Sequence, residues 1–262
     1  MDPATIAGVV LALLLLYVGI LVEGADPMSV FIIAPMIIVF GGTIGAGLAS
    51  STIKDTLYAI TTSPRWLFFK KPDANDTVET IVGLADRARR EGLLSLEDAA
   101  RTVDDMFLRE GLQAAIDGTD PDDLRDMLES RIFSKRSEDK VSAKFFNNMG
   151  GYAPTIGIIG TVVSLIHVLE NLNQPDELGH MIGAAFAATL WGLLSANLMW
   201  LPMGARITRC SELEASHMEL SVEGLLAIQA GANPRLVGQR LRSLMPPSEV
   251  ARHQAAEGKK AA

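Results

Sequence analysis

The sequence has almost no cysteine, because Cys210 is the only one among its 262 residues. No disulfide can form within the chain, and a lone thiol is consistent with a reducing compartment. Clustered lysine and arginine are also missing, and the net charge is −8. A nucleic-acid-binding protein needs a basic surface. The composition therefore excludes a disulfide framework and argues against nucleic acid as a partner.

Motifs of the common enzyme classes are missing as well. The sequence contains no Walker loop, no G-x-S-x-G, no H-E-x-x-H and no cysteine or histidine cluster with metal-ligand spacing. Its four histidines, at positions 167, 180, 217 and 253, are scattered. We therefore expect no catalytic residues, no metal site and no cofactor.

Charged residues are missing from four long apolar stretches. A membrane-spanning helix needs about 20 mostly apolar residues, because the hydrocarbon core is about 30 Å thick. Four stretches satisfy this requirement, and none contains Asp, Glu, Lys or Arg: Ala4 to Val22, Pro27 to Ile53, Phe145 to Leu169, and Leu178 to Ala205. The first lacks the basic flank of a cleaved signal peptide, so we expect it to be retained. The fold class predicted is an all-α membrane protein with four transmembrane helices.

Lysine and arginine are confined to two regions, which sets the predicted orientation. Fifteen lie between Lys54 and Lys144, and the other eight lie from Arg206 onward. Because basic loops stay on the cytoplasmic side, both regions are predicted to be cytoplasmic, as are both termini. The predicted organisation places transmembrane helices one and two in residues 1–53 and helices three and four in residues 145–205. A helical cytoplasmic insert (54–144) separates the two pairs. A cytoplasmic helical extension (206–245) and a disordered tail (246–262) follow.

The insert shows helical periodicity with clear end signals. An apolar stripe at helical spacing predicts a helix that ends at Gly92; its members are Val78, Ile81, Val82, Ala85 and Ala88. The run Ser95 to Asp98 predicts a capping box for the next helix, which should continue through Met106. Asp120 and Pro121 predict the start of a further helix that runs to about Ile132. After the fourth span, we expect the helix to continue to a break at Gly231, followed by a short helix from Pro234 to Leu244.

The predicted spans contain small and hydroxyl-bearing residues but no Asp, Glu, Lys or Arg, and their histidines are His167 and His180. Intramembrane ion carriers normally use an ionisable group, so an ion-conducting role requires a carboxylate from a partner. The alternative is a passive membrane anchor. Thr161 and Ser164 recur along one side of the third span, and Ala185, Thr189 and Gly192 form a small-residue stripe on the fourth. Such stripes allow close helix packing or line a narrow polar seam.

Several long motifs carry a resemblance to a known family. They are Gly151 to Thr161 (GYAPTIGIIGT), Val168 to Leu172 with Pro175, Ala185 to Gly192 (AFAATLWG), Leu201-Pro202, Ala88 to Glu97 (ARREGLLSLE), Glu223 to Gln229, and Gly231 to Arg235. In order and position they resemble the MotA/PomA family of bacterial flagellar motor stator A subunits, within the MotA/TolQ/ExbB superfamily. The likeness covers nearly the whole chain.

The resemblance implies a function in the bacterial inner membrane. In this family five A subunits surround two copies of a B subunit, which carries a membrane Asp and a peptidoglycan-binding domain. Ion flow past that Asp drives torque on a rotor switch protein. By matching motifs, Thr161, Ser164, Thr189 and Ala188 would lie along the ion pathway, with Thr161 and Thr189 beside the partner's Asp. The other implied roles are conformational coupling for Pro154 and Pro202, and rotor contact for Arg89, Arg90 and Glu97.

Two departures from the family pattern concern the predicted pathway. Ser164 stands where the family often has glycine, and Trp191 where it often has tyrosine, and both positions fall near the predicted pathway. Ala188 stands where sodium-type members tend to have a threonine, which favours protons over Na⁺ as the transported ion. Two other functions remain open: an ion-coupled energiser of the TolQ/ExbB type, and a membrane scaffold without ion flux.

Overall fold

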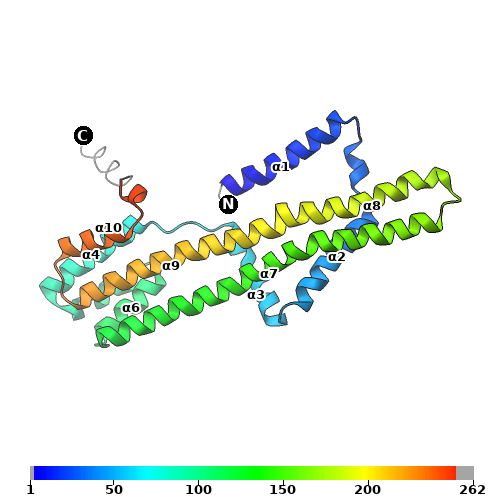
Figure 1. The fold of residues 1–262 in the computed structure, drawn as a ribbon. Coiled ribbons are helices and arrows are strands. Elements are labelled where there is room, and N and C mark those ends of the chain that lie inside the picture. The colour runs from blue at the N-terminus through cyan, green and yellow to red at the C-terminus, as the bar shows by residue number, and fades with distance from the viewer. Residues whose placement is uncertain (1–2, 252–262) are drawn as a thin grey trace. The chain divides into compact units, whose positions relative to one another are not determined.

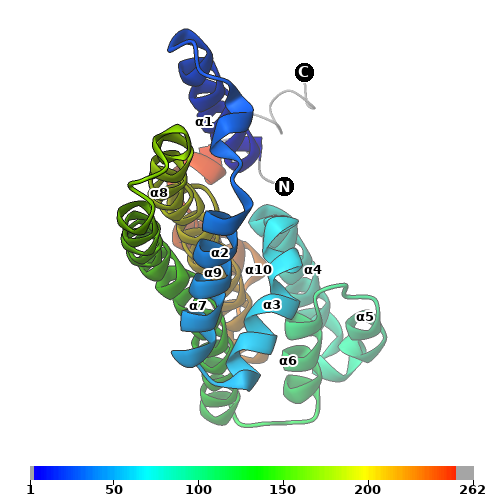
Figure 2. The same cartoon turned by 90° about the vertical axis from the view of Figure 1, so that its right-hand side faces the viewer.

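The computed structural model describes residues 3–251, with side chains from residue 6 onward, and this part of the chain contains helices and no strand. Its helices are shown in Figures 1 and 2, and the chain divides into two compact units. The apolar unit comprises Met1–Lys70 and Glu138–Cys210, and the charged unit comprises Lys71–Ser137 and Ser211–Ala262. The prediction of an all-α fold is confirmed for the described residues.

The apolar unit holds the long apolar helices. Its elements in chain order are α1 (Pro3–Val22), the short 3-10 helix η1 (Pro27–Val30), α2 (Ile33–Ala49), α3 (Ile53–Leu67), the second part of α7 (Pro121–Glu170), α8 (Pro175–Ser195), the π-helical turn η3 (Ala196–Trp200) and the start of α9 (Leu201–Gln229). α8, η3 and α9 form one uninterrupted helix over Pro175–Gln229. The predicted continuation of the fourth apolar stretch beyond residue 205 is therefore confirmed.

Two described helices are long and apolar enough to cross a membrane, namely Pro121–Glu170 and Pro175–Gln229. Two shorter apolar helices, Ile6–Val22 and Ile33–Ala49, correspond to the first two predicted spans. The second predicted span begins at Pro27, but its long helix begins later in the structure. Asp26 caps η1 through Met28 N, and α2 begins only at Ile33. Proline at the first helical position of η1 permits this short separate turn.

The charged unit consists of α4 (Ala74–Glu91), the 3-10 helix η2 (Leu93–Leu96), α5 (Glu97–Arg101), α6 (Met106–Ile116), the first part of α7, the end of α9, and α10 (Pro234–Leu244). The predicted stripe on α4 is buried at four of its five positions, with Val82 partly buried. Gly92 ends α4 with φ +85°, a backbone conformation that favours glycine. Asp120 accepts a hydrogen bond from Asp122 N at the start of α7, as predicted.

Three local predictions are wrong. The capping box at Ser95 does not form, because its hydroxyl donates to Gly92 O and the chain makes a 3-10 turn before α5. Asp105 starts a separate helix instead, by accepting from Phe107 N and Leu108 N. The helix from Pro121 does not end near Ile132 but continues to Glu170. No proline or glycine interrupts it before Gly150, so nothing local stops it.

Residues near the start of the tail that was predicted to be disordered, 246–262, are helical in the structure. Residues 247–251 form a helical turn, and Glu249 pairs with Lys71. The rest of the predicted tail, residues 252–262, lies outside the described residues. The prediction of disorder from the two prolines was therefore incorrect at its beginning, since Pro246 initiates a turn whose carbonyl accepts from Glu249 N.

The core of the charged unit is built from large aliphatic side chains. Ile81 of α4, Leu112 of α6, Leu128 of α7 and Leu225 of α9 are all fully buried there. Ion pairs tie the same helices at the rim. Arg125 of α7 contacts Glu223 of α9 at 3.1 Å, and Lys135 of α7 contacts Glu214 of α9 at 2.8 Å. Burial of apolar area supplies the main stabilisation, whereas partly exposed pairs add about 0–1 kcal/mol each.

Candidate functional site

The two predicted pathway threonines meet across α7 and α8. Thr161 Oγ1 lies 2.5 Å from Thr189 Oγ1 and 2.9 Å from Ala185 O. Each hydroxyl carries one hydrogen. When Thr161 donates to Ala185 O, Thr189 is left to donate to Thr161, which forms a directed chain between the two helices. Both side chains are only half-buried. A threonine in a helix often donates to the carbonyl group four residues earlier in its own helix. For Thr161 this contact, to Gly157 O, is the longer one at 3.1 Å.

Glycines bring the backbones of α7 and α8 into contact beside this threonine pair. A Cβ added at Gly157 would lie 2.9 Å from Ala188 O and 3.2 Å from Gly192 Cα. A Cβ added at Gly192 would lie 2.7 Å from Ala153 O. The obstructing atoms are backbone atoms that cannot rotate away. The small-residue stripe predicted on the fourth span therefore serves close helix approach.

The other two predicted pathway residues are placed differently. Ala188 is fully buried, and a Cβ added at Gly160 would lie 3.0 Å from its Cβ, so it fills the α7–α8 contact. Ser164 is half-buried one turn beyond Thr161 on α7. The structure thus brings Thr161 and Thr189 into direct contact and leaves Ala188 and Ser164 beside them.

Trp191 of α8 contacts the segment that connects α1 and α2. Its indole Nε1 donates to Val30 O at 2.7 Å, and its ring lies 5.2 Å from Phe31 and 6.1 Å from Phe40, measured between ring centroids. These partners belong to η1 and α2 and the link between them. Through these contacts Trp191 joins the α1–α2 connection to α8.

The two predicted coupling prolines lie within helices. Pro154 is inside α7, and Pro202 follows η3 near the start of α9. At η3 the Leu201 N–H bonds to Ala196 O, five residues back, and Pro202 has no N–H to offer. A Cβ added at Gly150 would lie 2.5 Å from Leu201 Cδ2, so the two proline-bearing segments pack closely. A proline beside a π turn is an ordinary cause of local helix bending.

The three predicted rotor-contact residues lie on the surface of the charged unit. Arg89 and Arg90 occupy the last turn of α4, and Glu97 opens α5; all three are exposed. Arg90 pairs with Asp86 at 2.8 Å and Glu97 with Arg101 at 3.1 Å, each within its own helix. No hydrogen bond or ion pair in the described part of the chain joins the arginines to Glu97. Leu94 is exposed between them, at 76%.

Comparisons with known proteins match this architecture. Residues 99–220 match the model of the MotA/TolQ/ExbB proton channel family. Motility protein A of Bacillus subtilis is 34% identical over 250 residues, which is 94% of this chain and 92% of that protein. The structure of the flagellar MotAB stator complex from Bacillus subtilis aligns with TM-score 0.88 and 31% identity, covering 95% of this chain and 98% of the other. The structure of C. jejuni MotAB aligns with TM-score 0.90 and 26% identity, covering 94% and 97%.

The chain belongs to the motility protein A family. It is a membrane-embedded stator subunit of the flagellar motor, and the predicted family is confirmed. The family consists of stator and ion-channel subunits and is not an enzyme family. Among the described residues, no three His, Cys, Asp or Glu side chains gather as a metal site.

Sequence reasoning missed a polar cluster in the charged unit of this stator subunit. His217 Nε2 of α9 lies 3.2 Å from Asp105 Oδ2 and 3.3 Å from Thr77 Oγ1 of α4. The contact with His217 is the main cause that holds the pKa of the Asp105 carboxyl below its usual value, and backbone N–H groups of α6 act in the same direction, while burial opposes them. The partners are more than 100 residues apart, so no spacing signal could reveal them. The sequence carries a signal for only one role of Asp105, that of an N-cap residue, because an acidic side chain precedes the apolar start of α6.

Proposed function

We propose that this stator subunit forms the ring that encloses a B subunit and carries protons past a carboxylate on that partner. The observation that carries the proposal is the Thr161–Thr189 pair, which lies between two apolar stretches without Asp, Glu, Lys or Arg. Ala4–Val22, Pro27–Ile53, Phe145–Leu169 and Leu178–Ala205 contain no Asp, Glu, Lys or Arg. A carboxylate that accepts and releases a proton must therefore come from the partner. Neutral hydroxyls at hydrogen-bond distance suit a carboxyl group that alternates between charged and uncharged forms.

The proposed topology is four membrane-spanning helices with both termini, the 54–144 insert and the 206–245 extension in the cytoplasm. The distribution of all 23 Lys and Arg supports it. The family's solved relatives are complexes of A and B subunits, which supports a B-type partner. A pentameric ring, a peptidoglycan-binding domain and an intramembrane Asp on that partner are further parts of the proposal, as is location in a bacterial inner membrane.

The threonine pair can be tested by substitution. We expect Thr161→Val to abolish swimming of a stator-less strain that also expresses the B subunit, because valine keeps the volume and removes the hydroxyl. Thr155→Val is the matched control. Thr155 is on the same helix, but it is exposed and donates only to Tyr152 O of its own helix at 2.8 Å. Equal loss of swimming in both variants, at equal membrane levels, would contradict a specific role for the pair.

The identity of the transported ion can be tested in the same stator-less strain. Its swimming is measured at fixed pH while the sodium concentration is varied, and again after a protonophore is added. Swimming that stops with the protonophore and ignores sodium supports protons. Swimming that follows the sodium concentration keeps the stator function and overturns the choice of proton. No swimming, with both subunits inserted, would favour an energiser of the TolQ/ExbB type or a scaffold.

Torque transfer is proposed to use the exposed charged rim at the end of α4 and the start of α5. The exposure of Arg89, Arg90 and Glu97 supports this, since their packing contribution to the fold is small. We expect Arg89→Glu to reduce torque while assembly with the B subunit stays intact. Failure of assembly instead would show that Arg89 has a structural role.

A further inference from the structure

The continuous α8–η3–α9 helix changes its hydrogen-bond pattern just before Pro202, the predicted coupling proline. In the π turn η3, Leu201 N donates to Ala196 O, five residues back instead of four. Pro202 has no N–H, and in a regular α-helix its ring would clash with the carbonyl of Leu198, four residues earlier. Within a membrane, a local π turn is one of the ways in which a helix accommodates proline. The sequence therefore provides a local cause for η3.

Two side chains donate to backbone carbonyls at the start of this π turn. Asn197 Nδ2 donates to Leu193 O at 2.8 Å, and Ser195 Oγ donates to Gly192 O at 3.2 Å. The same two carbonyls share the single N–H of Ala196. In apolar surroundings a carbonyl without a full backbone donor is costly, so a side-chain donor stabilises the arrangement that needs it. The amide of Asn197 makes the shorter bond and is the main side-chain support of η3.

Asn197 lies on the same side of its helix as one member of the threonine pair. Thr189, Leu193 and Asn197 follow one another at four-residue spacing, which places them on one helix face. Asn197 is exposed, and it lies about 12 Å along the helix axis from Thr189. Among the described residues, Leu193 O is the only hydrogen-bond partner of its side chain. The amide that supports the π turn is therefore accessible from the face that carries Thr189.

The π turn also contains a buried donor without a partner. Trp200, the last residue of η3, is 7% exposed, and its ring stacks on Phe146 of α7 with 6.5 Å between the ring centroids. No acceptor in the described part of the chain lies within hydrogen-bond distance of Trp200 Nε1. A buried N–H without an acceptor costs free energy. The present position of the turn is therefore unfavourable for Trp200, and the bonds of Asn197 and Ser195 oppose that cost.

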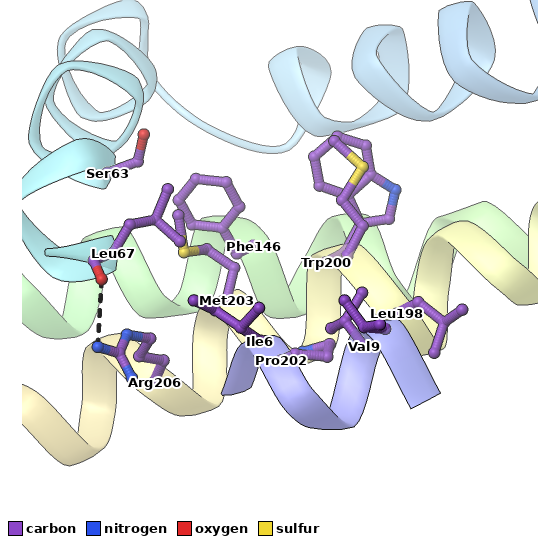
Figure 3. Close-up of a pocket in the computed structure, with 12 residues that line it drawn as sticks. Ile6, Val9, Ser63, Leu67, Phe146, Leu198, Trp200, Pro202, Met203 and Arg206 are labelled. Carbon is purple, nitrogen blue, oxygen red and sulfur yellow. Dashed lines mark hydrogen bonds between the residues drawn. The ribbon is translucent and has the colours of Figure 1, made fainter. Parts of the chain in front are cut away.

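The packing around η3 leaves room for the turn to move. Gly192 before the turn and Leu201 after it both lie against α7. Between these contacts, Leu198 and Pro202 line a cavity of about 470 Å³ (Figure 3). A π turn holds more residues than an α turn, so moving it along a helix rotates only the side chains that it passes. A shift confined to the segment between Gly192 and Pro202 thus leaves both contacts with α7 in place.

We propose that Asn197 is a positioning residue of the coupling segment, whose amide holds the π turn beside Pro202 until the turn shifts along the helix. This inference rests on the proposed function, because it assigns a moving part to the proposed ion cycle. When the amide releases Leu193 O, the turn loses its main side-chain support and moves away from Pro202. When the bond forms again, the turn returns. The surroundings of the Trp200 indole change with each shift.

The position of the turn can be followed through Trp200. The complex with the B subunit is labelled with 5-fluorotryptophan, and the ¹⁹F resonances of the three tryptophans of this chain are assigned by Trp→Phe variants. Asn197→Leu removes the donor at similar volume and should shift the Trp200 resonance, while those of Trp66 and Trp191 stay in place. The hydroxyl introduced by Asn197→Ser can donate to the carbonyl four residues back, so this variant should restore the wild-type resonance. An unchanged Trp200 resonance in Asn197→Leu would overturn the proposal.

Swimming of the stator-less strain tests the coupling role. At equal membrane levels, Asn197→Leu should reduce swimming speed several-fold, and Asn197→Ser should retain most of it. Met199→Leu is the matched control, because Met199 is exposed in the same turn and has no hydrogen-bond donor in its side chain. It should change neither the Trp200 resonance nor the speed. If Asn197→Leu fails to assemble, Asn197→Ala provides the same test, because alanine favours a helix and also lacks a donor.

The two measurements separate this inference from the proposed function. A complex that swims equally well with Asn197→Leu contradicts only the role of Asn197. A wild-type complex that cannot restore swimming, yet whose Trp200 resonance responds to Asn197→Leu and recovers in Asn197→Ser, contradicts only the proposed function. Equal loss of speed in Asn197→Leu, Asn197→Ser and Met199→Leu would show that the turn tolerates no substitution, and it would overturn a specific role for the amide.

Discussion

The two units of this stator subunit use the same long helices but pack them in different ways. In the apolar unit, α7 and α8 approach through Gly157 and Gly192 until backbone atoms touch. In the charged unit, α7 and α9 pack with buried leucines, and ion pairs bridge them at the rim. Without water, there is little hydrophobic force between membrane helices, so close contact and hydrogen bonds must hold them. With water outside, burial of large side chains does most of this work.

The largest expected effect lies in the core of the charged unit. Leu112→Ala removes a fully buried side chain, and we expect a loss of about 2–5 kcal/mol of stability. Hydrogen exchange of α4 and α6 amides, measured by mass spectrometry on the purified complex, should increase. Exchange in α8 should change little if the two units depend on different packing. A comparable increase in α8 would contradict the separation of the units.

The next effect lies at the helix contact of the apolar unit. Gly157→Val must displace the backbone of α8, at about 1–3 kcal/mol or more, and should abolish swimming. Gly83→Ala is the contrasting variant in the charged unit. No atom lies within 4 Å of a Cβ added at Gly83, so alanine there should stabilise α4 by about 0.4–1 kcal/mol. Thermal unfolding of both variants in detergent measures the difference. Similar effects of the same sign would remove the distinction between the units.

A smaller effect concerns the Asp105 cap. Asp105→Ala removes the bonds to the first N–H groups of α6 and should cost about 0.5–2 kcal/mol. Because the folded-state pKa of Asp105 is lowered, its stabilisation is present above the unfolded-state pKa and is lost as pH falls through the folded-state value. The protection factors of α6 amides, which are corrected for the intrinsic pH dependence of exchange, should therefore fall on acidification in the wild type, and less so in Asp105→Ala. An identical pH dependence in both would show that another group is responsible.

The smallest effect on folding is expected at the charged rim. Glu97→Gln breaks the exposed pair with Arg101, which spans four residues of one helix and is worth about 0.5 kcal/mol or less. Stability should stay nearly unchanged, while torque measured on a tethered cell should fall under the proposed rotor contact. A loss of stability above 1 kcal/mol would indicate a structural role for Glu97.

Sequence patterns predicted the helical features whose causes are local. The apolar stripe of α4, the end at Gly92, and the starts of α7 and α10 were all predicted from spacing and capping residues. The capping box at Ser95 was wrong because the same hydroxyl can satisfy a nearby carbonyl in a 3-10 turn. The full length of α7 was missed because its end was predicted near Ile132, where no proline or glycine stops the helix.

Sequence alone sufficed to predict the helical class, the absence of Asp, Glu, Lys and Arg from the four apolar stretches, and the family. These follow from hydropathy, charge placement and long motifs, each of which is local or additive along the chain. Only the tertiary structure decided that Thr161 meets Thr189, that Trp191 turns toward Val30, and that His217 meets Asp105. Such pairs join distant positions through the rotation and register of packed helices. Those are set by close packing of many side chains at once, which no single stretch of sequence records.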